Sequence, residues 1–214
     1  MSGFFITIEG IEGAGKTTAL NFIKKFFTQI NLPATFTREP GGTANAEQIR
    51  QLLLSKKLES PLPETELMLM FASRLEHTRN LILPALNADN IVVSDRYYDA
   101  SYAYQGGGRL LNPKKIDELR SWVLGDFTPN LTILLDVPIS VSIARIAKRK
   151  NLDRIESEKQ EFFLRVKEHY LGLARNNPRF VCIDSTLPLS EVEQQLKDII
   201  SSKLPDRFKK YRVE

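Results

Sequence analysis

The stretch that decides the fold reads Gly10-Ile11-Glu12-Gly13-Ala14-Gly15-Lys16-Thr17. It matches the pattern G-x-x-x-x-G-K-[ST] in full, between the apolar run Phe4–Ile8 and a stretch whose apolar residues recur at helical spacing from Ala19 to Ile30. A strand, such a loop and a helix in succession place backbone N–H groups and the positive end of the helix around phosphate oxygens. The motif therefore predicts a site for the phosphates of a nucleotide.

Two side chains of this loop carry the expected chemistry. Lys16 reaches the β- and γ-phosphates, and the Thr17 hydroxyl ligates Mg²⁺. Asp95 closes a later apolar run, Ile91–Ser94, as the acidic residue that holds the Mg²⁺ water shell opposite Thr17. An aspartate at a strand end is more often a cap. Its neighbour Arg96 offers a planar fork for a second phosphate and favours the functional interpretation.

Short apolar runs rich in β-branched residues recur along the chain and indicate buried parallel strands. The runs are Phe4–Ile8, Ala34–Thr37, Ile91–Ser94, Leu131–Asp136 and Phe180–Ile183. Stretches with helical spacing separate them, among them the long segment Glu64–Leu86. The alternation predicts an α/β fold, a doubly wound five-stranded parallel sheet of the P-loop NTPase kind. Ligands of such sheets bind beyond the carboxyl ends of the strands, so the residues after each run are candidates for the site.

Length and composition narrow the class of protein. The 214 residues fit one domain, 1–214, with a small mobile lid at about residues 145–156, where basic residues gather. A net charge of +4 suits an anionic small substrate but is too weak to indicate a nucleic-acid partner. Because no apolar run has membrane length, we expect no membrane partner and a cytoplasmic location. The single cysteine, Cys182, lies in an apolar run, which favours a buried structural thiol in a reducing compartment.

Several motifs agree with one family at once. They are Ile8–Thr18, Thr37–Thr43, Asp95–Tyr97, Ala103–Gly108, Gly125–Phe127 and Leu152–Glu156. With these motifs the chain resembles thymidylate kinase of the bacterial type, a P-loop nucleoside monophosphate kinase, nearly end to end. The resemblance implies an enzyme that uses ATP and Mg²⁺ to phosphorylate dTMP to dTDP in dTTP synthesis, by direct in-line transfer. It also implies a homodimer, which composition does not show.

The resemblance assigns residues to both substrates. It places ATP against Gly10, Ile11, Glu12, Gly13, Ala14, Gly15, Lys16, Thr17, Thr18 and Arg145. It places dTMP against Glu12, Arg38, Glu39, Arg50, Met70, Phe71, Arg74, Arg96, Ser101 and Gln105. Glu12 is expected at the sugar 3′-hydroxyl, and Arg38 and Arg96 at the acceptor phosphate. Arg50 is a further expected contact near the sugar or phosphate, although arginines on helices are often solvated.

The thymine site contains one departure from the family pattern. Arg74 resembles the residue that donates to the thymine carbonyl, and Ser101 and Gln105 resemble the polar pair at the base edge. The base-stacking phenylalanine of the family usually lies four residues before that arginine, where this chain has Met70, with Phe71 next. Both positions lie on the Arg74 face of a helix. The flat π-face of Phe71 makes it the favoured stacking residue, with Met70 as the alternative.

A basic segment completes the expected charge distribution. It contains Arg145, Lys148, Arg149 and Lys150. In bacterial-type enzymes the lid supplies a catalytic arginine, and Gly13 stands where other thymidylate kinases carry that arginine in the phosphate loop. Arg149 is the expected group, with Arg145 as the alternative, although basic runs are often only solvated surface. The expected catalytic set is Lys16, Arg149, Arg96 and Glu12.

Two rival functions are compatible with a phosphate loop. One is another nucleoside monophosphate kinase with the same core, which the choice of acceptor would reveal. The other is a regulatory NTPase switch or a nucleic-acid-dependent ATPase. The sequence has neither a guanine-reading N-K-x-D motif nor a basic groove pattern with interleaved aromatic residues, so we favour the kinase.

Overall fold

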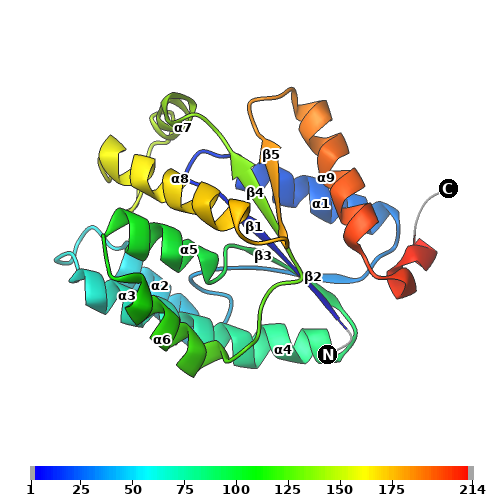
Figure 1. Ribbon diagram of the computed structural model, residues 1–214, viewed down its shortest axis with the longest axis horizontal. Coiled ribbons are helices and arrows are strands. Elements are labelled where there is room, and N and C mark those ends of the chain that lie inside the picture. The colour runs from blue at the N-terminus through cyan, green and yellow to red at the C-terminus, as the bar shows by residue number, and fades with distance from the viewer. Residues whose placement is uncertain (1–2, 212–214) are drawn as a thin grey trace.

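The computed structural model describes residues 3–211; residues 1–2 and 212–214 lie outside the described part. A single five-stranded sheet has the order β2-β3-β1-β4-β5, and all neighbouring strands are parallel (Figure 1). The strands are β1 (Phe4–Glu9), β2 (Ala34–Arg38), β3 (Ile91–Asp95), β4 (Leu131–Asp136) and β5 (Phe180–Asp184). The predicted fold class is confirmed, and each predicted strand ends at most one residue from its observed end.

Helices lie on both faces of the sheet (Figure 1). They are α1 (Lys16–Gln29), α2 (Ala44–Leu54), α3 (Pro63–His77), α4 (Leu83–Asn87), α5 (Asp99–Ser101), α6 (Pro113–Leu124), α7 (Ile139–Ile146), α8 (Gln160–Arg175) and α9 (Leu189–Lys203). Two π-helical turns, η1 (Thr78–Ile82) and η2 (Tyr102–Gly108), and the 3₁₀ helix η3 (Asp206–Tyr211) complete the list. Side chains of β1 alternate between the two faces: Phe5 packs with α3, α4 and α6, whereas Ile6 and Ile8 pack with α1, α8 and α9.

The register of the sheet brings the carboxyl ends of the strands together. Ile8 of β1 is opposite Asp95 of β3, and Asp95 is also opposite Arg38 of β2. On the other side of β1, Glu9 is opposite Leu134 of β4. The residues that follow β1, β2 and β3 therefore meet at one edge of the sheet, as the sequence predicts.

The segment Glu64–Leu86 is helical throughout, as its spacing predicts, but it is not one regular α-helix. It contains α3, the π-helical turn η1 and α4. Pro84 is the reason that a regular helix cannot continue, because it has no N–H for the carbonyl of Asn80 and its ring would press against that carbonyl. The extra residue in a π turn accommodates this break while keeping the apolar stripe on the core.

The expectation of a buried Cys182 is wrong. Its thiol-bearing side chain is exposed on β5, an edge strand. Phe180 and Ile183 of the same strand are buried, whereas Asp184 is exposed. Neighbouring strands and helices cover an edge strand on fewer sides than a central strand. The apolar run around Cys182 therefore predicted more burial than the structure shows.

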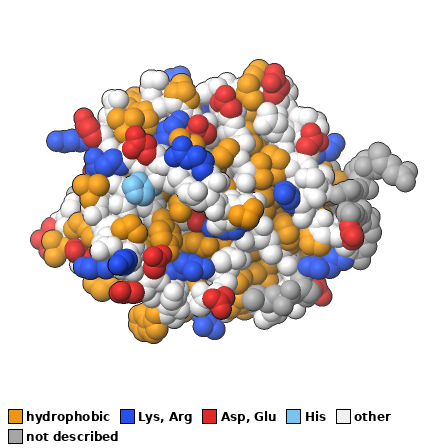
Figure 2. Space-filling model, in the orientation of Figure 1, with side chains coloured by type: hydrophobic (Ala, Val, Ile, Leu, Met, Phe, Trp, Pro, Cys, Tyr) orange, Lys and Arg blue, Asp and Glu red, His pale blue; other side chains and the backbone are white. Residues whose placement is uncertain are grey.

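The surface has mixed charge. On the face shown in Figure 2, basic and acidic side chains are interspersed and hydrophobic side chains occur in small groups between them. Within residues 3–211, no helix combines the length and apolar character needed to cross a bilayer.

Candidate active site

A cavity of about 730 Å³ lies at the edge of the sheet where the strands β1, β2 and β3 end. The predicted site residues that line it are Glu12, Gly13, Ala14, Gly15, Lys16, Thr17, Thr18, Arg38, Glu39, Arg50, Met70, Arg74, Asp95, Arg96, Ser101, Gln105, Arg145 and Arg149. Three predicted residues are not part of the lining: Gly10, Ile11 and Phe71. The structure thus brings predicted residues that are far apart in the sequence, such as Glu12 and Arg149, around one cavity.

The phosphate loop holds its lysine in a compact arrangement. The Lys16 ammonium donates to the carbonyls of Gly10 and Ile11, at 3.1 and 3.2 Å, so these two residues support the lysine through their backbones. Burial, with the positive charge of Arg96, lowers the pKa of Lys16 to about 8. Gly13 has φ of 74°, and a Cβ there would lie 2.7 Å from the Ser142 carbonyl oxygen of α7. The loop therefore has no room for a side chain at position 13.

Thr17 and Asp95 fit a divalent cation. Both line the cavity, and the Asp95 Oδ1 atom is buried without a hydrogen-bond partner among the described residues. A carboxylate oxygen and a hydroxyl are ligands that Mg²⁺ accepts. Within residues 3–211 no group of three or more His, Cys, Asp or Glu side chains could enclose a metal. This sparse set suits Mg²⁺, which usually keeps water and substrate phosphate oxygens as its remaining ligands.

Three side chains hold the Arg96 guanidinium at the cavity. It donates to Glu12 Oε1 at 2.7 Å, to the Tyr104 hydroxyl at 2.8 Å and to the Tyr170 hydroxyl at 3.0 Å. Although burial opposes the charge, Tyr104 and Glu12 raise the pKa of Arg96 well above its usual value. Its backbone has φ of 71°, an unusual conformation that turns the residue away from β3. Sequence reasoning found Arg96 and Glu12 but missed both tyrosines.

A buried carboxyl supports this arrangement from behind. Glu9 accepts hydrogen bonds from the Tyr97 backbone N–H at 2.8 Å and from the Tyr170 hydroxyl at 2.7 Å. Burial, together with the nearby Asp99, raises the pKa of Glu9 to about 8. Glu9 thereby positions Tyr170, which in turn contacts Arg96.

The Arg74 guanidinium is fixed on three sides. It donates to Glu39 Oε2 at 2.7 Å, to the Ser101 hydroxyl at 3.0 Å and to the Tyr97 carbonyl at 3.2 Å. Only 2% of Arg74 is exposed. Its guanidinium also lies over the Phe71 ring, 4.7 Å from the ring centre. Arg74 is therefore held rigidly where it meets the cavity.

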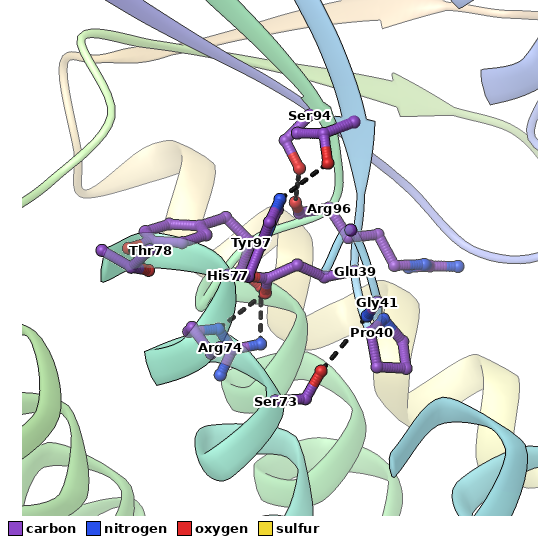
Figure 3. A network of polar contacts seen from close by, with 12 residues as sticks. Glu39, Pro40, Gly41, Ser73, Arg74, His77, Thr78, Ser94, Arg96 and Tyr97 are labelled. Atoms are coloured by element: carbon purple, nitrogen blue, oxygen red, sulfur yellow. Dashed lines mark hydrogen bonds and ion pairs between the residues drawn. The ribbon is translucent and has the colours of Figure 1, made fainter. Parts of the chain in front are cut away.

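A second layer of contacts holds Glu39 against α3 (Figure 3). His77 Nδ1 lies 3.1 Å from Glu39 Oε1, and its Nε2 lies 2.7 Å from the Thr37 hydroxyl. The Gly41 backbone N–H donates to the Ser73 hydroxyl at 3.1 Å. The loop after β2 is thus attached to α3 at two points, which places Glu39 beside Arg74.

The comparisons with known proteins agree with this geometry. The sequence model of the thymidylate kinase family matches residues 8–196. The chain is 48% identical over 201 residues to the thymidylate kinase of Vesicomyosocius okutanii, covering 94% of this chain and 98% of that one. It is 47% identical over 197 residues to the thymidylate kinase of Neisseria meningitidis serogroup C, covering 92% and 95%. A crystal structure of thymidylate kinase from Ehrlichia chaffeensis superposes with a TM-score of 0.76 at 31% identity, covering 94% and 99%.

The chain belongs to the thymidylate kinase family. In this chain, the basic segment at the end of α7 and beyond it contains two arginines with different surroundings. Arg145 donates to the Gly13 carbonyl at 3.0 Å and to the Ser185 carbonyl at 3.1 Å, so it is part of the wall behind the phosphate loop. Arg149 lines the cavity, is paired with Glu156 and keeps about half of its side chain exposed (48%). Of Arg145 and Arg149, only Arg149 is exposed enough to exchange its present partner for another.

Met70 and Phe71 lie in different surroundings in this chain. Met70 lines the cavity, whereas Phe71 is only 1% exposed and belongs to the core cluster with Phe5 and Leu67. The structure therefore does not bring Phe71 to the cavity, contrary to the expectation that favoured it. Successive residues of a helix point about 100° apart, so only one of two neighbours faces the site.

Sequence reasoning also missed the apolar end of the cavity. This end is formed by residues after β5 and in the first turns of α9, mostly apolar but including one carboxylate: Ser185, Leu187, Leu189, Val192, Glu193 and Leu196. No motif marks these residues. The usable signal was their place beyond the carboxyl end of the fifth strand, where ligands of such sheets bind.

Proposed function

We propose that this chain transfers the γ-phosphoryl group of ATP to dTMP and so supplies dTDP for dTTP synthesis. The observation that carries the proposal is the placement of Lys16 and Arg96 around one cavity. Each is a cation suited to phosphate, and they come from different strand ends. A site with two phosphate-binding ends suits transfer between two nucleotides better than simple hydrolysis or a regulatory switch.

ATP occupies the phosphate loop in this proposal. Backbone N–H groups from Gly13 to Thr18 surround its phosphates, and Lys16 contacts the β- and γ-phosphates. The adenine lies toward the apolar end near Leu187, with Arg145 beside it. Thr17 and Asp95 would hold Mg²⁺, which would neutralise charge on the ATP phosphates when bound with the nucleotide.

dTMP occupies the other half of the cavity. Its phosphate meets Arg96, with Arg38 and Arg50 nearby, and its sugar hydroxyl meets Glu12. Thymine is bordered by Arg74, Ser101 and Gln105 and is covered by Met70. The fixed position of Arg74 supports this assignment, because a preorganised donor loses little conformational freedom on binding a base carbonyl.

Transfer proceeds in line: a dTMP phosphate oxygen attacks the γ-phosphorus while the bond from that phosphorus to the β,γ-bridging oxygen breaks, and ADP leaves. No protein nucleophile is required, so the residues act by positioning and by stabilising charge. Arg149 moves from Glu156 to the transferring phosphoryl group as the lid closes, which also excludes water. Lys16 binds the ATP phosphates and Arg96 binds the dTMP phosphate, on either side of the transferring phosphoryl group.

A homodimer working in the cytoplasm completes the proposal. Large hydrophobic side chains of α3 and α6 are exposed, including Met68 at 54% and Trp122 at 83%. These two helices pack against each other, so their outer surfaces form a suitable dimer contact. Light scattering after size exclusion tests the assembly, and a monomer at micromolar concentration would contradict it.

The decisive experiment measures ADP production with ATP, Mg²⁺ and one nucleoside monophosphate at a time. dTMP should stimulate ADP production most strongly, and Lys16→Ala should abolish the stimulation while leaving the circular dichroism spectrum unchanged. Stronger stimulation by another monophosphate would identify a different monophosphate kinase. Hydrolysis that ignores every monophosphate would favour the regulatory switch.

A further inference from the structure

A buried carboxylate outside the proposed substrate contacts connects the lid to the thymine side of the cavity. Glu66, in the first turn of α3, has no exposed surface. Its Oε2 accepts from Arg154 at 2.7 Å, and its Oε1 accepts from the Gln105 side-chain amide at 2.8 Å. Arg109 Nε lies 3.3 Å from both oxygens. One carboxylate therefore holds side chains from η2, from the segment after it and from the lid.

Arg154 anchors the lid segment to the body of the protein. Besides Glu66, its guanidinium donates to the Leu53 carbonyl at 2.8 Å, and its backbone N–H donates to the Leu54 carbonyl at 3.3 Å. These carbonyls belong to the last turn of α2, where helix carbonyls lack partners and a positive charge is stabilising. Arg154 is only 8% exposed. The lid segment thus has one fixed end at Arg154 and the other at Arg145.

Arg149 is connected to this fixed end through a short turn. Arg149 pairs with Glu156, whose Oε2 accepts from the Asp153 backbone N–H at 3.1 Å. In return, the Glu156 backbone N–H donates to Asp153 Oδ1 at 2.8 Å. This closed turn contains Arg154. The backbone of the segment that carries Arg149 is therefore anchored where Glu66 holds Arg154, whichever partner the Arg149 side chain has.

The carboxylate also determines how Gln105 faces the base. A carboxylate only accepts hydrogen bonds, so the Gln105 amide nitrogen must point toward Glu66. The amide oxygen is then not engaged by Glu66, and Gln105 lines the cavity. Although burial opposes ionisation, Arg109 and the other partners lower the pKa of Glu66, so it stays charged at neutral pH.

We infer that Glu66 is a positioning residue for phosphoryl transfer, which acts on Arg149 through Arg154 and joins lid placement to the thymine edge at Gln105. The inference rests on the proposed dTMP kinase activity. Glu66 itself touches neither substrate in this assignment. A network of contacts suggests coupling but does not measure it, so the test must report the coupling itself.

The test is a double-mutant cycle in steady-state kinetics with ATP and dTMP. Glu66→Gln keeps the shape of the side chain but removes the charge that holds Arg154. We expect kcat to fall at least ~10-fold, because small displacements of a catalytic group can cost ~10²-fold. The KM for ATP should change less than ~2-fold. In an Arg149→Ala background, Glu66→Gln should lower kcat by no more than ~2-fold further, since the residue through which it acts is gone.

Glu158→Gln is the matched control. Glu158 pairs with Arg109 at 2.7 Å in the same cluster but contacts neither Arg154 nor Gln105 in the described bonds. The same substitution there should leave kcat within ~2-fold of wild type. Arg154→Lys serves as a second probe if Glu66→Gln folds poorly by thermal melting, and it should give the same loss of kcat with the same dependence on Arg149.

The outcomes separate this inference from the proposed function. If the wild type fails to phosphorylate dTMP, the proposed function is wrong. If the wild type is active but the losses from Glu66→Gln and Arg149→Ala multiply, Glu66 is merely structural and the inference is overturned. Equal losses in Glu66→Gln and Glu158→Gln would overturn it as well.

Discussion

The carboxylate of Glu12 and the guanidinium of Arg96 lie 2.7 Å apart, so the anion assigned to the sugar hydroxyl holds the cation assigned to the acceptor phosphate. Tyr104 donates to the other Glu12 oxygen at 2.5 Å and accepts from Arg96 at 2.8 Å. These three side chains close a triangle of contacts in the lining of the cavity. A nucleotide phosphate that reaches Arg96 must therefore share it with Glu12.

Arg96→Ala should weaken dTMP binding about 10-fold to 100-fold, as expected for loss of charge-assisted hydrogen bonds, while the ATP Kd stays within ~3-fold. Separate calorimetric titrations of the two nucleotides measure this. Arg38→Ala is the comparison variant, because Arg38 is half exposed (50%) and pairs with Glu47; its effect should be smaller. A defect confined to ATP would move Arg96 to the donor side.

Met70→Ala should raise the dTMP KM, because Met70 lines the cavity and Phe71 does not. Covering a base is worth roughly 1–3 kcal/mol when the residue is aromatic, so a ~3-fold to 10-fold increase is expected for methionine. Phe71→Leu should lower the melting temperature instead, with a smaller change in KM. The reverse pattern would restore Phe71 as the residue that covers thymine.

Arg149→Ala should lower kcat at least ~10²-fold with little change in the ATP Kd, as expected for an arginine that acts on the transition state. Arg149→Lys should recover only part of the loss, because lysine lacks the planar fork. Single-turnover kinetics and nucleotide titration separate the two quantities. If Arg149→Ala is nearly active and Arg145→Ala is not, Arg145 is the catalytic arginine.

Glu9 should make stability fall as pH rises. Burial raises its pKa from 4.5 to about 8, so between these values the native state keeps a proton that the unfolded chain has lost. Stability falls with rising pH wherever the native state binds more protons. The melting temperature of wild type should therefore drop relative to that of Glu9→Gln between about pH 5 and pH 8. Burial also raises the pKa of Asp99. Because Asp99 is present in both proteins, the comparison with Glu9→Gln isolates the contribution of Glu9. A difference that is constant over this range would contradict the shifted pKa.

The strands and the phosphate loop could be predicted because their signals are local. The predicted strands, read from runs rich in β-branched residues, end within one residue of the observed strand ends. The glycine pattern correctly placed Lys16 in the loop between β1 and α1, at the start of the helix. Contacts between distant segments were not accessible in this way. Tyr170 reaches Arg96 from α8, and no local pattern around Tyr170 distinguishes it from an ordinary core tyrosine.

The errors have physical causes of the same kind. Cys182 lies on an edge strand whose position follows from the strand order, which a single apolar run does not reveal. Helical spacing alone cannot tell whether Met70 or Phe71 faces the site, because both lie near the Arg74 face of the helix. The packing of α3 on Phe5 decides that Phe71 is the core residue. Glu66 went unnoticed because an acidic residue near a helix start usually serves only the helix dipole.

The strand order has a consequence for synthesis on the ribosome. β1 precedes the other described strands in the chain, yet it pairs with β3 at Phe4 and Ile91 and with β4 at Ile6 and Leu131. Until β3 has emerged, the apolar side chains of β1 have no strand to pair with, and its other edge stays open until β4 is made; pairing across such separations is slow. We therefore expect the nascent chain to remain unable to bind ATP until β4 is made, and its first strand to be the segment that chaperones engage.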